Sequence, residues 1–114
     1  MMKIKNDFIT NSSSTAFIIY NNSDKELSLV DFVKENPQLI EQFKKEYDYE
    51  SNPEYTQENL IESAERVNEE LYMGSNHMIF GDEDGTLIGK VFDYILRDGG
   101  SSKNFSWEFY EYMR

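Results

Sequence analysis

The chain has 114 residues, of which 39% are hydrophobic and 15% aromatic, and this composition predicts one globular domain over residues 1–114. Its formal charge is −11 and it contains no cysteine, which excludes disulfide bonds, thiol nucleophiles and zinc sites built on thiolates. No apolar run reaches the roughly 20 residues that span a bilayer, and we recognise no secretory signal at the start of the chain. We therefore expect a cytoplasmic protein that does not contact a membrane.

Two strands are predicted near the N-terminus. Residues 2–5 alternate apolar and charged side chains, which is typical of a short half-buried strand. Residues 15–20 are rich in β-branched and aromatic side chains and favour a second strand. The segment Asn11-Ser12-Ser13-Ser14-Thr15 between them has no glycine and leads into a strand rather than a helix. A structural turn is therefore favoured over a phosphate-binding loop or a catalytic serine.

Two short helices are predicted next. Ser28 is the expected N-cap of the first, because Asp31 lies three positions later and can complete a capping box. The second helix is expected to begin at Asn36-Pro37, with Asn36 as its cap. The apolar side chains of these helices are Leu29, Phe32 and Val33 in the first, and Leu39, Ile40, Phe43 and Tyr47 in the second. Residues 48–55 are polar and predict a loop.

The clearest helical pattern begins at Thr56, the expected N-cap of a third helix. Its apolar side chains recur at helical spacing, and Gly74 is expected to end it. The members of this stripe are Leu60, Ala64, Val67 and Leu71. A short strand is predicted over residues 77–80, followed by an acidic loop. Thr86 is the expected cap of a fourth helix that ends before Gly99-Gly100.

The C-terminal segment predicts a strand with one aromatic face. Phe105, Trp107 and Phe109 alternate with polar residues, while Tyr110 and Tyr112 fall on the opposite face. Strands at both ends of the chain with helices between them predict an α+β fold. We expect a small three- or four-stranded sheet with about four helices packed mainly on one face.

No pattern in the chain favours an enzyme. The single histidine, His77, has no acidic residue at a spacing typical of a catalytic pair. The acidic loop does not match a calcium-binding EF-hand, because Leu87 stands where that loop requires glycine and Asp93 where it requires glutamate. We therefore predict no catalytic residue, no metal site and no cofactor.

The negative charge is concentrated in the middle of the chain. Residues 41–84 contain 13 acidic and 3 basic residues, which gives −10, whereas the remainder contains 9 acidic and 8 basic residues. A row of glutamates follows the same helical rhythm as the apolar stripe of the third helix and is expected on its opposite face: Glu58, Glu62, Glu65 and Glu69. Such a surface repels nucleic acid and attracts basic partners.

Two segments carry a resemblance to other proteins. The stretch NDFITNSSSTAFII resembles the opening NDF(V/I)TNSSSxSF(I/V) shared by many small uncharacterised proteins of bacteria and their phages. The later stretch GDEDGTLIGKVFDYILRDGG looks like a recurrent second block in some of them. The family has no established activity, so the resemblance implies an origin and carries over no site residues.

Two hypotheses of function follow. In the first, a phage-encoded interaction protein occupies the basic, nucleic-acid-binding surface of a host protein by mimicking phosphates. The carboxylates that would make this contact are Glu58, Glu62, Glu65 and Glu69, with Asp82, Glu83 and Asp84. In the alternative, the acidic residues serve only to keep the protein soluble. The domain is then a structural or accessory subunit, or it associates with itself through Tyr110, Tyr112 and Met113.

Overall fold

The computed structural model describes residues 14–81 and 85–113, which form an α+β fold. A four-stranded antiparallel sheet has the order β4-β1-β6-β5, and a smaller sheet pairs β2 with β3. The strands are β1 (Ser14–Asn21), β2 (Leu27–Ser28), β3 (Glu70–Leu71), β4 (Gly74–Gly81), β5 (Gly100–Ser101) and β6 (Phe105–Met113). The predicted fold class is confirmed, and the strand predicted at residues 2–5 lies outside the described residues.

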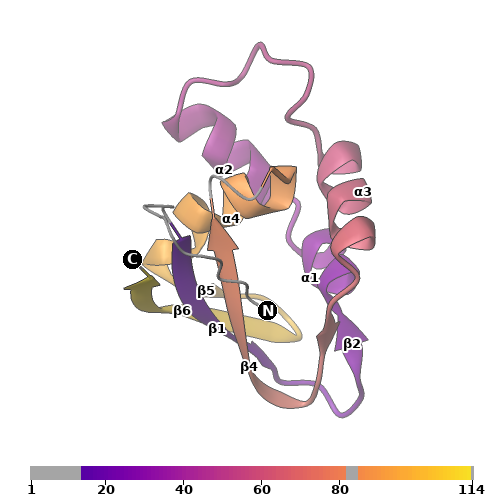
Figure 1. Cartoon of the computed structure of the whole chain (residues 1–114). Helices are drawn as coiled ribbons and strands as arrows, with labels where there is room; N and C mark the ends of the chain where they lie inside the picture. The colour runs from indigo at the N-terminus through magenta and orange to yellow at the C-terminus, as the bar shows by residue number, and fades with distance from the viewer. Residues whose placement is uncertain (1–13, 82–84, 114) are drawn as a thin grey trace.

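The described residues form four α-helices, the number predicted. They are α1 (Leu29–Glu35), α2 (Gln38–Glu46), α3 (Gln57–Val67) and α4 (Leu87–Ile95), which continues into the short 3-10 helix η2 (Leu96–Asp98). In the view of Figure 1, α2 and α4 lie above the sheet, whereas α1 and α3 lie to its right. The aromatic centre of the core joins helix to sheet, because the Phe32 ring of α1 meets the rings of Phe92, Phe105 and Trp107 edge-on at 5.2 to 5.6 Å.

Three of the predicted helix caps are present. The Asp31 N–H donates to Ser28 Oγ at 3.2 Å and the Asp31 carboxylate accepts from the Ser28 N–H at 2.9 Å, which completes the capping box. Thr56 and Thr86 cap α3 and α4 in the same way, accepting the backbone N–H three residues later. The prediction for Asn36 is wrong: its side-chain amide donates to the Phe32 carbonyl at 2.9 Å, so it closes α1 instead of opening α2.

The predicted length of the third helix is also wrong. α3 ends at Val67, because Asn68 adopts a left-handed conformation with φ 57° and turns the chain back. Asparagine tolerates this conformation better than most residues. Leu71 is fully buried, but it belongs to β3, where it pairs with Leu27. The spacing of Leu71 after Val67 therefore continued the helical stripe only by coincidence.

A β-bulge in β6 corrects the predicted face of Tyr112. Phe17 lies opposite Phe109 but Ala16 lies opposite Glu111, so Tyr110 is an extra residue in β6. Beyond the bulge, the side chains change face. The Tyr112 ring consequently lies on the same face as Phe109, with 4.8 Å between the ring centroids, and only Tyr110 keeps its predicted place on the outer face.

Candidate acidic surface on α3

Helix α3 has one buried side that fixes its position. Leu60 and Ala64 have no exposed area, and they pack toward α1 and α4. Two hydrogen bonds fix the rotation of α3 about its axis. Ser63 Oγ accepts the Ile88 N–H of α4 at 3.1 Å, and the Gln57 side-chain amide donates to the Val33 carbonyl of α1 at 2.9 Å. The opposite side of α3 is thereby held toward solvent.

Three of the four predicted helical glutamates share that exposed side. Glu58, Glu62 and Glu65 are all exposed and lie at positions i, i+4 and i+7 of α3. At about 100° per residue their side chains leave the helix within about 60° of one another. A rise of about 1.5 Å per residue separates successive members by roughly 4.5 to 6 Å along the axis. The structure thus brings these three carboxylates into one row.

Of the remaining predicted site residues, only Glu69 is described, and it does not extend this row along the helix. Glu69 is exposed but lies beyond the end of α3, where its carbonyl oxygen accepts the Leu29 N–H at 3.0 Å. Glu69 follows the helical spacing of the other three glutamates in the sequence, but the left-handed turn at Asn68 ends the helix before it. Asp82, Glu83 and Asp84 lie outside the described residues.

One basic side chain of the helix itself contacts the row. Arg66 Nη2 lies 3.5 Å from Glu62 Oε1, and both side chains are exposed, at 76% and 60%. Exposed pairs of this kind contribute about 0–1 kcal/mol, because solvent screens the charges. Among the described residues, no ion pair involves Glu58 or Glu65. The row therefore keeps most of its negative charge.

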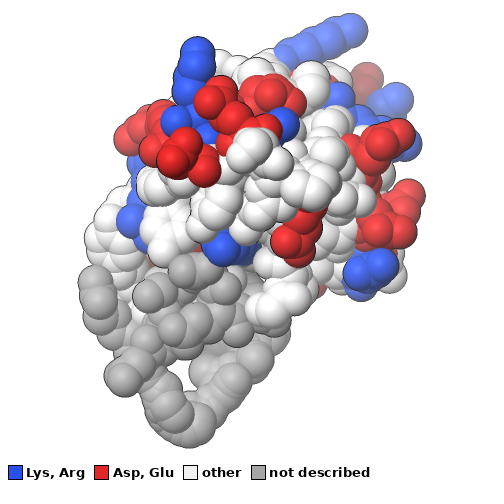
Figure 2. Space-filling model, turned by 90° about the horizontal axis from the view of Figure 1, so that it is seen from above, with Lys and Arg blue, Asp and Glu red and all other residues white. Residues whose placement is uncertain are grey.

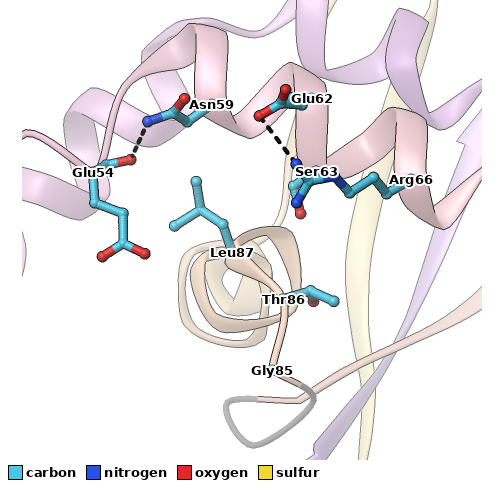
Figure 3. A pocket seen from close by; sticks show the side chains of 8 residues that line it. All are labelled: Glu54, Asn59, Glu62, Ser63, Arg66, Gly85, Thr86 and Leu87. Atoms are coloured by element: carbon cyan, nitrogen blue, oxygen red, sulfur yellow. Dashed lines mark hydrogen bonds and ion pairs between the residues drawn. The ribbon is translucent and has the colours of Figure 1, made fainter.

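A shallow hollow lies beside the row, between α3 and the start of α4 (Figure 3). Its charged lining combines Glu54 and Glu62 with Arg66, and its only hydroxyl on α3, Ser63, is already used as an acceptor by the α4 backbone. In the part of the chain that the structure describes, no three acidic or histidine side chains are grouped to hold a metal ion. The hollow thus presents side chains of both charges.

Acidic side chains gather at more than one place on the upper surface of the molecule. Figure 2 shows red side chains at the right, on the side of α3, with blue side chains beside them, and a second red group at the upper left with blue side chains among them. The surface between the two groups is mostly uncharged in this view, with a further red group within it. The acidic side chains on this side of the molecule are therefore gathered in separate groups and do not form one continuous negative face.

His77 and the end of the serine segment have structural contacts. The His77 ring on β4 meets the Tyr110 ring edge-on at 5.3 Å across the outer face of the sheet. Thr15 is buried and its hydroxyl donates to the Asp93 carboxylate at 2.6 Å. Asn11, Ser12 and Ser13 lie outside the described residues.

One buried ionic group is not evident from the sequence. Asp93 has no exposed area, and Arg97 Nη2 lies 3.1 Å from its carboxylate oxygen. The guanidinium group of Arg97 also lies over the rings of Tyr94 and Tyr112, at 4.7 and 5.1 Å from their centroids. The i,i+4 spacing of Asp93 and Arg97 was the only signal for the pair in the sequence, and nothing in it indicated burial.

Comparison of the chain with known family models, curated proteins and solved structures finds no significant match to any of them. Within residues 14–81 and 85–113, no helix is both long and apolar enough to cross a lipid bilayer. Inference about function therefore rests on the geometry and charge of the chain's own residues.

Proposed function

We propose that this chain is an interaction protein, encoded by a phage, that binds the basic nucleic-acid-binding surface of a host protein in the cytoplasm. The α3 carboxylates would stand where phosphates bind. The observation that carries the proposal is the exposed row of Glu58, Glu62 and Glu65 on a helix whose opposite side is fixed in the core. Glu69, Asp82, Glu83 and Asp84 are proposed to add charge around this row.

The spacing of the row suits a surface that binds phosphates. Successive carboxylates lie roughly 4.5 to 6 Å apart along the helix axis. Phosphates follow one strand of a nucleic acid at about 3.4 Å of axial rise and at longer steps along the backbone. Arginine and lysine side chains are long enough to accommodate this difference, and arginine binds carboxylate and phosphate in the same bidentate manner.

Long-range attraction supports the same mechanism. Residues 41–84 carry a formal charge of −10 out of the total of −11. A field of this sign accelerates encounter with a basic surface at low salt and is screened beyond roughly 8 Å at physiological ionic strength. Binding is therefore expected to be fast, strongly dependent on salt and competitive with nucleic acid.

A charge-reversal experiment tests the proposal. The tagged protein is used to capture partners from a bacterial lysate at low and moderate salt, alongside a variant that combines Glu58→Lys, Glu62→Lys and Glu65→Lys. The matched control reverses three exposed glutamates elsewhere, in and after α2: Glu41→Lys, Glu46→Lys and Glu50→Lys. Both variants change the net charge by the same amount, so a difference between them reports position and not total charge.

The expected result is that a basic protein is captured by the wild type and the control and released by the α3 variant. Added nucleic acid should compete with the wild type for the purified partner. Equal loss of capture in both variants would show that only net charge matters and would remove α3 as the binding surface. Retention by the α3 variant would contradict the proposal directly.

A further inference from the structure

Within the described residues, no strand neighbours one edge of β4 from Gly74 to Phe80. The order β4-β1-β6-β5 places β4 at the end of the sheet. Its pairing with β1 runs without a shift from Ser14 opposite Gly81 to Asn21 opposite Gly74, so no bulge interrupts this pairing. Over residues 74–80, and as far as the described chain extends, no strand lies on its other edge.

This edge lacks the features that usually prevent strands from associating. Proteins protect exposed edges with lysine, proline, a bulge or a very short strand. The eight residues of β4, GSNHMIFG, contain no acidic residue, lysine, arginine or proline, and the strand has no bulge. The other end of the sheet is different: β5 has two residues, and the part of β6 beyond it carries Glu108 and Glu111 and packs against η2.

The side chains of β4 also suit association on both faces. Met78 and Phe80 are buried and belong to the core. Ser75, His77 and Ile79 alternate with them and are exposed on the outer face, and Ile79 keeps 41% of its surface. An added strand would therefore extend the core on one face and cover an uncharged surface on the other.

We propose that two copies of this chain associate by pairing β4 with β4 in antiparallel orientation about a two-fold axis, which extends the sheet across both molecules. A strand edge is self-complementary in this arrangement, because each molecule offers the same pattern of N–H and C=O groups. With a net charge of −11, two copies repel each other over most of their surface, and β4 is an uncharged strip where they can approach.

This dimer does not depend on the binding of a basic partner by α3. It places the contact between copies on β4 and not on the terminal strand β6. One strand edge buries less than the roughly 800 Å² per partner of a standard stable interface. The dimer is therefore expected to be weak and to depend on protein concentration, and higher salt should strengthen it by screening the negative charge.

Sedimentation of the full chain across a wide concentration range tests the proposal. The wild type should pass from monomer to dimer, and Ile79→Lys should weaken the dimer by more than about tenfold, because it places a charge on the pairing edge in each copy. Tyr110→Lys is the matched control: Tyr110 is exposed on the same face but lies on β6. It should leave the dimer intact, and circular dichroism confirms that both variants are folded.

Because the chain has no cysteine, single cysteines report the geometry directly. Opposed residues of an antiparallel pair have Cα atoms about 4.5 to 5.5 Å apart, which suits a disulfide. Ser75→Cys, His77→Cys and Ile79→Cys are oxidised alone and in pairwise mixtures. One alignment of the two strands should give cross-links only in combinations whose residue numbers have the same sum, such as 77 with 77 together with 75 with 79, whereas Tyr110→Cys should give none.

Three results would overturn the proposal. The first is a monomer at every concentration, which would mean that β4 does not pair with a second copy. The second is a dimer that survives Ile79→Lys but is lost in Tyr110→Lys, which would assign the contact to β6. The third is a dimer in which no β4 cysteine forms a cross-link.

Discussion

Replacing Glu35 by glutamine should loosen the turn between β5 and β6. The Glu35 carboxylate, at the last residue of α1, accepts three hydrogen bonds from this turn. Ser102 Oγ donates at 2.5 Å, the Asn104 N–H at 2.7 Å and the Asn104 side-chain amide at 2.8 Å. Burial by itself raises the pKa of Glu35, but the hydrogen bonds from Asn104 and Ser102 outweigh burial and lower the pKa below its usual value.

The expected loss in the free energy of unfolding is about 1–2 kcal/mol. Hydrogen bonds to a charged group contribute roughly 1.5–3 kcal/mol each where the group is buried, and less here because Glu35 is only half-buried. Glutamine keeps one acceptor oxygen, but its amide N–H₂ faces the donor groups of Asn104. A negative charge at the C-terminal end of a helix is unfavourable, so its removal from α1 stabilises the folded state by roughly 0.3–1 kcal/mol and offsets part of this loss. For a chain of this size the net loss lowers the melting temperature by about 4–8 °C.

The effect of pH on this difference follows from the sign of the pKa shift. A carboxylate whose pKa is lowered on folding stabilises the protein above its unfolded pKa, and the contribution disappears as pH falls through the folded pKa. Denaturation of wild type and Glu35→Gln should therefore differ at neutral pH and converge in acid. Glu58→Gln, on the exposed side of α3, is the control and should change stability little. A difference that stays constant into acid would refute the assigned role of the carboxylate.

Three further substitutions test other parts of the fold by denaturation. Asp93→Asn should lower the free energy of unfolding by about 3 kcal/mol or more, since it leaves Arg97 without its buried charge partner; a loss below about 1 kcal/mol would contradict this. Gly100→Ala should cost about 1–3 kcal/mol and shift the fluorescence of Trp107, because the added Cβ would lie 2.6 Å from the indole ring. Thr56→Ala should cost about 1 kcal/mol by removing the cap of α3, and an unchanged stability would argue against the cap.

The parts of the fold that were predicted correctly depend on neighbouring residues in the chain. Ser28, Thr56 and Thr86 cap helices because a hydroxyl bonds the backbone three residues later, an interaction that needs no distant partner. The buried sides of α1 and α2 follow from helical spacing in the same way. Local spacing also placed Glu58 and Glu62 correctly on the exposed side of α3.

The errors arise where distant segments decide the conformation. The spacing of Leu71 in the sequence continues the apolar stripe of the helix. In the structure the chain turns at Asn68, and Leu71 reaches the core as part of β3, which pairs with β2. The bulge at Tyr110 depends on how β6 aligns with β1, and it moves Tyr112 to the opposite face from the one that strict alternation predicts. Neither alignment can be read from the spacing of residues within one segment.

The acidic row of α3 is informative because the fold does not require it. Like charges three or four residues apart destabilise a helix by about 0.2–0.5 kcal/mol per pair. Burial of Leu60 alone contributes about 1.5–3 kcal/mol, so α3 forms in spite of this repulsion and gains nothing from it. Lysine at Glu62 or Glu65 would relieve the repulsion and keep the surface equally polar. Apart from Arg66, which pairs with Glu62, α3 does not offset this repulsion, and the proposed binding to a basic surface would give the row a role that polarity alone does not require.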